Sequence, residues 1–324
     1  MRAPRPPWPL ACLVLATAAC SPPEPAPEPA AGRDVLRVGV TVPPQAYLVE
    51  RLGGERVAIE VLMPSGSSEE TFSPSPRQMV ALTRADLFLV VGHPAFLVER
   101  RHVLPALARN PEARVVAMAG GRQDLKRPSS DPGLSERSES NGSAGAGGGH
   151  GHGGASGDPH LWTAPRHMRE AAAAVAAALE ELDPVAAPLY RARLASLLAD
   201  LDALDAEVRR ELSGLDRRRF LVTHPAWGHF AAEYGLEQVA IEDEGKEPGP
   251  RRLVALVELA RAEGMRAVFS QAGFPDAAAR ALAAEIGARV VPLDPLARDW
   301  LDNTRATARA IAAALGPPAP APVL

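Results

Sequence analysis

The chain has 324 residues, 46% of them hydrophobic, so it can bury a sizeable core, and its length suits two lobes better than one. Its 35 lysines and arginines and 39 aspartates and glutamates give a formal net charge of -4 and a pI of about 6.1. This balance provides no basic footprint and argues against nucleic acid as a partner.

The N-terminus is typical of a bacterial lipoprotein signal peptide. A short apolar run over residues 10–19 follows two arginines, is too brief to span a bilayer and ends in small residues. The stretch LATAAC at 15–20 resembles a lipobox, in which the cysteine is lipidated and becomes the first residue of the mature protein. We therefore expect a signal peptide over 1–20 with lipidation at Cys20; the alternative is an ordinary signal peptide cleaved near Ala19.

A proline-rich segment at 21–33 follows the cysteine and should run as an extended, semi-rigid tether. Such a tether would hold a folded domain away from a membrane. We therefore expect an extracytoplasmic protein, a periplasmic or cell-surface lipoprotein anchored to a bacterial membrane. Another proline-rich segment, 317–324, forms a C-terminal tail.

In the N-terminal part of the chain, short apolar runs alternate with helical patterns. We place an N-terminal α/β lobe at 34–182. This alternation indicates βαβ units and a mostly parallel sheet. We expect strands at 35–42, 57–63, 87–91 and 115–118, and helices at 45–52, 76–84 and 94–109.

The same alternation returns in a C-terminal lobe at 215–316. We expect strands at 220–223, 238–241, 267–270 and 289–293, and helices at 226–234, 250–264, 276–286 and 299–315. Between the lobes, a linking segment at 183–214 carries leucines and alanines at three- and four-residue spacing. A helix from Pro184 to Ser213 would be about 45 Å long.

The predicted fold is thus α/β, with two mostly parallel-sheet α/β lobes joined by one long rigid helix and a metal site in the interlobe cleft. We expect each lobe to have its own core. An insertion at 126–157 is rich in serine, glycine and charge without periodicity, and should be a disordered surface segment. We expect its His150 and His152 to form a small auxiliary metal-binding tract.

Metal-competent side chains occur in short segments far apart in the chain. His160 stands in Asp-Pro-His, His224 in Thr-His-Pro and Asp294 in Leu-Asp-Pro-Leu, and Glu70 lies between a predicted strand and a predicted helix. Two imidazoles with one or two carboxylates suit a borderline divalent ion such as Zn²⁺, with Mn²⁺ as the alternative if carboxylates dominate. We predict no catalytic residue.

The remaining histidines have no such pattern. His229 lies five residues after His224, off the i, i+4 face, and we expect it on a helix surface or a cleft wall. His93, His102 and His167 have no spacing partners and are expected to be ordinary surface or packing residues.

Several motifs resemble the solute-binding receptors of bacterial zinc and manganese ABC importers. They are DPHLW at 158–162, HPAWGHF at 224–230 and the segment at 291–300, and the resemblance runs from Val38 to Asn303. It implies a receptor that captures a divalent ion and delivers it to a membrane permease.

By the same resemblance, His160, His224 and Asp294 fall on metal-binding positions. The first ligand of the family is usually a histidine, and this sequence has Glu70 there. Glu70, the neighbouring Glu69 or a water molecule could fill that position.

The leading interpretation is a monomeric, non-enzymatic receptor of an ABC-importer permease, with zinc favoured over manganese or iron. The alternatives are a secreted zinc hydrolase and an adhesion lipoprotein with an incidental metal. Two histidines and a carboxylate could hold catalytic zinc, but neither a His-Glu-x-x-His helix nor a Gly-x-Ser-x-Gly elbow accompanies them.

Overall fold

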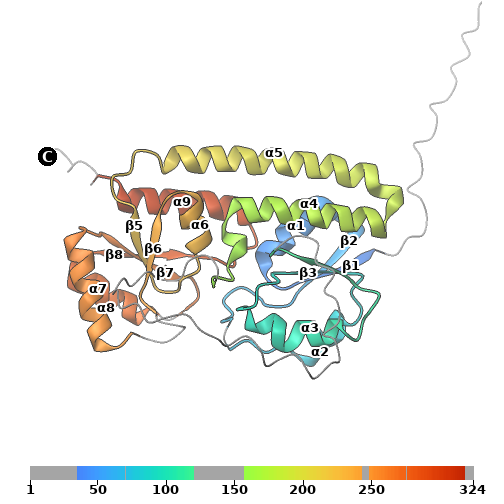
Figure 1. The fold of residues 1–324 in the computed structure, drawn as a ribbon, viewed down its shortest axis with the longest axis horizontal. Helices are drawn as coiled ribbons and strands as arrows, with labels where there is room; N and C mark the ends of the chain where they lie inside the picture. The colour runs from blue at the N-terminus through green and yellow to red at the C-terminus, as the bar shows by residue number, and fades with distance from the viewer. Residues whose placement is uncertain (1–34, 70, 120–156, 243–247, 275, 318–324) are drawn as a thin grey trace, which may run out of the picture. The chain divides into compact units, whose positions relative to one another are not determined.

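The computed structural model describes residues 35–69, 71–119, 157–242, 248–274 and 276–317, which form two four-stranded parallel sheets (Figure 1). The first sheet has the order β2-β1-β3-β4 and the second the matching order β6-β5-β7-β8. The strands are β1 (Leu36–Val40), β2 (Val57–Val61), β3 (Leu87–Val90), β4 (Arg114–Ala117), β5 (Arg219–Val222), β6 (Glu237–Ala240), β7 (Ala267–Gln271) and β8 (Arg289–Leu293). The predicted α/β fold with two parallel-sheet lobes is confirmed.

The helices follow the strands as βαβ units require. They are α1 (Pro43–Gly53), α2 (Pro76–Leu82), α3 (Leu104–Leu107), α4 (Pro165–Leu182), α5 (Ala187–Glu211), α6 (Gly228–Glu233), α7 (Pro250–Ala262), α8 (Ala277–Ile286) and α9 (Trp300–Leu315). Short 3-10 turns lie at Gly54–Arg56, Leu161–Thr163 and Pro184–Ala186, and a π-helical turn lies at Glu99–Val103.

Two helical regions differ from the sequence prediction. The helix expected at 94–109 is a π-helical turn followed by the short α3. The buried Glu99 begins that turn and binds the backbone of the preceding loop, accepting hydrogen bonds from the amides of Val91 and Gly92 at 2.6 and 2.8 Å. The helix α4 was not among the predicted elements.

The predicted long helix is present as α5, preceded by the 3-10 turn at Pro184–Ala186. Its 25 α-helical residues correspond to about 38 Å at 1.5 Å per residue. The buried residues Leu197, Leu201, Leu204 and Val208 recur every three or four positions and form one apolar stripe. The helix packs against α1 and α4 beside the first sheet and against α9 beside the second (Figure 1).

The expectation of a separate core in each lobe is wrong. The larger apolar cluster joins strands of both sheets with α1, α4, α5 and α9, and a smaller cluster lies between the second sheet and α7 and α8. Two buried indoles connect the lobes, since Trp162 Nε1 donates to the Pro295 carbonyl at 2.7 Å and Trp300 Nε1 donates to the Trp162 carbonyl at 2.7 Å. The lobes are therefore packed as one unit.

Several predicted features lie outside the described residues. They are the signal peptide, the tether, all but one residue of the C-terminal tail and of the insertion, and with them Cys20, His150, His152 and also Glu70. Within the described part of the chain, no helix is long and apolar enough to cross a membrane.

The shared core predicts how the protein loses stability. Leu204→Ala removes a fully buried side chain of α5 and should lower the free energy of unfolding by about 2–5 kcal/mol. Because α5 packs on both lobes, tryptophan fluorescence and far-UV circular dichroism should report one shifted denaturation transition. Leu189→Ala, at a residue of the same helix that is 41% exposed, is the matched control and should change little. Two separate transitions, only one of them shifted, would contradict a shared core.

Candidate metal centre

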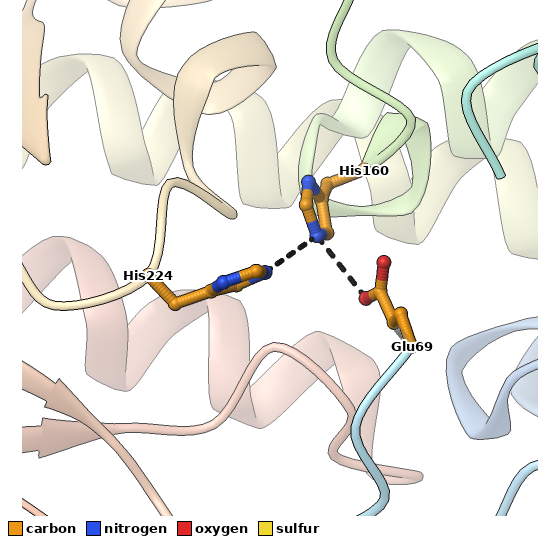
Figure 2. Close-up of side chains that lie close together, drawn as sticks. All are labelled: Glu69, His160 and His224. Carbon is orange, nitrogen blue, oxygen red and sulfur yellow. Dashed lines mark hydrogen bonds and ion pairs between the residues drawn. The ribbon is translucent and has the colours of Figure 1, made fainter. Parts of the chain in front are cut away.

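Glu69, His160 and His224 meet between the two lobes, although more than sixty residues separate each from the next (Figure 2). One ligand atom from each lies within 4.8 Å of the others. Within the described ranges, this is the one group of three or more such side chains with that proximity.

His160 is held by its own segment. It precedes the 3-10 turn Leu161–Thr163, and the Asp158 carboxylate oxygen Oδ1 accepts from the His160 backbone amide at 2.9 Å and lies 2.6 Å from the ring nitrogen Nδ1. The side chain of His160 is only 4% exposed. A Cβ at Gly228 would lie 2.4 Å from Asp158 Oδ2, so glycine there lets α6 approach this carboxylate. Asp158 therefore fixes both the backbone and the ring of His160.

His224 is positioned by the second sheet. It comes two residues after β5, and its Nδ1 lies 3.1 Å from Oε2 of Glu242, which comes two residues after the neighbouring strand β6. The carboxyl ends of adjacent parallel strands meet at one edge of a sheet, where ligands of open α/β folds bind. The sheet thus places His224 and its carboxylate partner side by side.

Glu69 comes from the loop after β2. The Ser65 hydroxyl in this loop donates to the Leu296 carbonyl at 3.0 Å, which connects the loop to the second lobe. Glu69 Oε1 lies 3.1 Å from His160 Nε2, and the side chain is 11% exposed. This oxygen is buried and makes no hydrogen bond of good geometry within the described residues. It is therefore available as a ligand atom.

The donor atoms have the spacing of a metal site. Nε2 of His160 lies 3.1 Å from Nε2 of His224 and from Oε1 of Glu69, and the two imidazole rings have centroids 5.0 Å apart at 82° (Figure 2). Neighbouring ligands of a tetrahedral zinc ion lie roughly 3.3 Å apart when each bond is about 2.0–2.1 Å. Both imidazoles contact a carboxylate through Nδ1, an arrangement that orients metal-binding histidines and leaves Nε2 for the ion.

The carboxylates around His160 favour its protonated form. Burial alone would lower the pKa of His160, but the Glu69 carboxylate and the contact with Asp158 outweigh it and raise the pKa to about 10. The pKa of Asp158 is lowered: burial opposes this, and the hydrogen bond and charge of His160 outweigh the burial. At neutral pH the imidazolium neutralises buried negative charge, and a divalent ion at the same point would do so as well.

The predicted site residues have different outcomes. His160 and His224 lie together, and Glu69, one of the alternatives for the first position, joins them. Asp294 directly follows β8 but is not in the group; its Oδ1 accepts from the Leu296 amide at 2.8 Å, and burial raises the pKa of its carboxyl. Glu70 lies outside the described residues, so the structure does not test it.

Sequence reasoning missed Asp158 and Glu242 as partners of the imidazoles. Asp158 stands two residues before His160, a spacing at which an aspartate can bind the following backbone, and that signal was available. Glu242 is 18 residues from His224, and only the pairing of β5 with β6 brings them together. His229, expected on a helix surface or cleft wall, is buried with 3% exposure, and its ring packs on that of His167.

Comparison with known proteins gives a consistent result. The profile of the family described as "Zinc-uptake complex component A periplasmic" matches residues 38–314. A high-affinity zinc uptake system protein ZnuA from Paracoccus denitrificans (strain Pd 1222) is 30% identical over 250 residues, covering 74% of this chain and 77% of that protein. A putative metal-binding protein from Treponema pallidum (strain Nichols) is 29% identical over 260 residues, covering 79% of this chain and 78% of that protein.

A solved structure is also similar. A crystal structure of a ZnuA deletion mutant with zinc bound has a TM-score of 0.73 and 34% identity, and the match covers 88% of this chain and 100% of that one. The similarity includes both lobes.

The pKa of His160 predicts how the stability of metal-free protein depends on pH. The folded state keeps the His160 proton up to about pH 10, whereas the unfolded state loses it near 6.5, so the stabilisation is complete below 6.5 and declines as pH rises towards 10. From pH 7 to pH 9 this group alone should lower the free energy of unfolding by about 2–3 kcal/mol.

Urea denaturation in the presence of a chelator measures this slope. His160→Gln should make it shallower, and His102→Gln, which alters a histidine outside the cluster, should not. An unchanged slope in His160→Gln would show that His160 does not retain its proton in the folded protein.

Proposed function

Because this chain belongs to the family of periplasmic zinc-uptake component A proteins, the metal-binding receptors of ABC importers, we propose that Glu69, His160 and His224 hold the captured ion. The observation that carries the proposal is the convergence of two imidazole Nε2 atoms and a buried carboxylate oxygen, each 3.1 Å from the next, between the lobes. Both imidazoles are oriented from behind by carboxylates.

Zinc is the ion that we propose. Two neutral imidazoles and a carboxylate are a donor set that Zn²⁺ prefers, and the Paracoccus relative is a zinc uptake protein. Asp294 is proposed as a fourth ligand, because it stands at the carboxyl end of β8 and the neighbouring Leu296 contacts the loop of Glu69 through Ser65. A second carboxylate would increase the share of oxygen ligands, and the affinity of the site for Mn²⁺ would then come closer to its affinity for Zn²⁺.

The ion is cargo, so the site has to release it as well as bind it. We propose that the receptor works outside the cytoplasm, delivers the ion to a membrane permease, and is anchored through a lipid on Cys20. Support for the anchor comes from the lipobox and the proline-rich tether. His150 and His152 are proposed to bind further ions weakly, because neutral imidazoles are ligands of Zn²⁺.

Elemental analysis of protein purified without chelators tests the choice of ion. We expect zinc at about one tightly bound equivalent from the site of Glu69, His160 and His224, and Mn²⁺ should fail to displace it at equal concentration. Bound manganese, or displacement of zinc by equimolar Mn²⁺, would contradict the zinc assignment but not the site.

Two adjacent carboxylates allow a matched test of the site itself. Glu69→Ala removes an oxygen that faces His160 and should weaken zinc binding by roughly 10–100-fold. Glu70→Ala, at the neighbouring position that the proposed ligand set leaves out, should alter the affinity by less than about threefold. Competition with a zinc-binding dye measures both. A loss in Glu70→Ala with no change in Glu69→Ala would restore Glu70 as the ligand and overturn the proposed set.

A further inference from the structure

His167 and His229 form another pair of imidazoles, distinct from the three-residue cluster. His167 lies in the first turn of α4 and His229 is the second residue of α6. Their ring centroids are 5.0 Å apart and the planes cross at 89°. The pair in the candidate metal centre, His160 and His224, has nearly the same geometry, with 5.0 Å and 82°.

In each ring of the pair, one nitrogen contacts an oxygen of a neighbouring residue and the other nitrogen has no partner within the described residues. His229 Nε2 lies 2.8 Å from the carbonyl oxygen of Asp158, and since a carbonyl only accepts, Nε2 carries the proton and donates it. His167 Nδ1 lies 3.5 Å from the Glu170 carboxylate, which favours the proton on that nitrogen. The remaining atoms, Nδ1 of His229 and Nε2 of His167, are buried and have no hydrogen-bond partner within the described residues.

This is the pattern of a metal-binding histidine, whose outer N–H donates to a carbonyl or carboxylate while the inner nitrogen offers its lone pair. A buried polar atom without a partner is costly and calls for an explanation. For two imidazoles on a tetrahedral zinc ion, the ring centroids lie roughly 5 Å apart, because each centroid is about 3.2 Å from the ion. The separation of His167 and His229 fits that value.

We propose that His167 and His229 form a second site for a borderline divalent ion such as Zn²⁺, bound through His167 Nε2 and His229 Nδ1, with water completing the coordination. The site rests on the proposed function only for the choice of ion. With two protein ligands, it binds more weakly than the cluster at Glu69.

The surroundings allow an ion to enter and leave. The His167 side chain is 17% exposed, so the pair borders solvent on one side although both ligand nitrogens are buried. Burial and the nearby Arg166 guanidinium lower the pKa of His167, which keeps its imidazole neutral as a ligand must be. Arg166 also repels a cation, whereas the carboxylates of Glu170 and Glu233 attract one. Glu233 lies close to Arg166, because its Oε2 accepts a hydrogen bond from the Arg166 backbone amide at 3.4 Å. The balance suits a weak, exchangeable site.

Asp158 connects the two sites. Its carbonyl oxygen accepts from His229, and its carboxylate contacts His160. Asp158 thus contacts both His229 of the second site and His160 of the first. The pair is placed to hold an ion briefly beside the tight site.

The experiment uses the full chain with His150→Gln and His152→Gln, so that the insertion contributes no imidazole. Zinc titration by calorimetry should show two equivalents, the second at least about tenfold weaker because it has fewer protein ligands. His167→Gln in this background should remove only the second equivalent, and His229→Gln should do the same. His102→Gln, a histidine outside both groups, should leave both equivalents intact.

Ring ¹⁵N NMR supplies a readout that a purely structural role would not change. The second equivalent should shift the resonances of His167 Nε2 and His229 Nδ1. The proposal is overturned if the parent binds only the tight equivalent, which would leave the pair bridged by water, if the second equivalent survives His167→Gln, or if the shifts fall on other histidines. A parent that binds only the weak equivalent, lost in His167→Gln, would support this site and contradict the function proposed for Glu69, His160 and His224.

Discussion

Two buried indole N–H groups hold the lobes together, and the position of the metal centre depends on them. Trp162 donates to the carbonyl of Pro295 in the second lobe, and Trp300 donates to the carbonyl of Trp162. Trp162 lies two residues after His160, and Pro295 directly follows Asp294. A buried indole N–H without an acceptor would be costly, so this arrangement is strongly preferred. The same bonds that satisfy the indoles bring together the segments of both lobes that carry the proposed ligands.

Charge balance explains how acidic side chains can be buried at this site without a metal ion. Asp158 and Glu69 both contact the His160 imidazole, which carries a proton at neutral pH. The positive charge of the protonated ring offsets the carboxylates in the absence of a metal ion. The fold therefore does not bury uncompensated negative charge. Binding a divalent cation at these atoms exchanges one positive species for another, and the proton leaves the ring as the ion arrives.

Local patterns predicted most of the fold. The buried β3 run Leu87–Val90 was found because parallel strands covered on both faces are continuously apolar. The helix α4 was missed although its buried residues recur at three- and four-residue spacing, a signal that the sequence already carried; α1 and α5 pack on it. The shared core also escaped prediction, since no local pattern states which lobe an apolar stripe will contact.

The site was only partly predictable, for a related reason. The histidines His160 and His224 could be found because proline and strand ends accompany them. The choice between Glu69 and Glu70 could not be made, because adjacent residues in a loop point in different directions that only the folded chain fixes. The partnership of His224 with Glu242 depends on strand pairing, and the burial of His229 depends on α6 packing near the turn at Leu161–Thr163.

The continuous core has a consequence for how cargo is exchanged. Receptors that open and close by a hinge motion of their lobes need an interface between the lobes that separates at a small cost in free energy. Here separating the lobes would expose the stripe of α5, the indoles of Trp162 and Trp300, and much of the larger apolar cluster. We therefore expect the ion to enter and leave through local displacement of the loop that carries Glu69, while the helices beneath it keep their packing. The permease would then need to move one loop rather than half of the receptor.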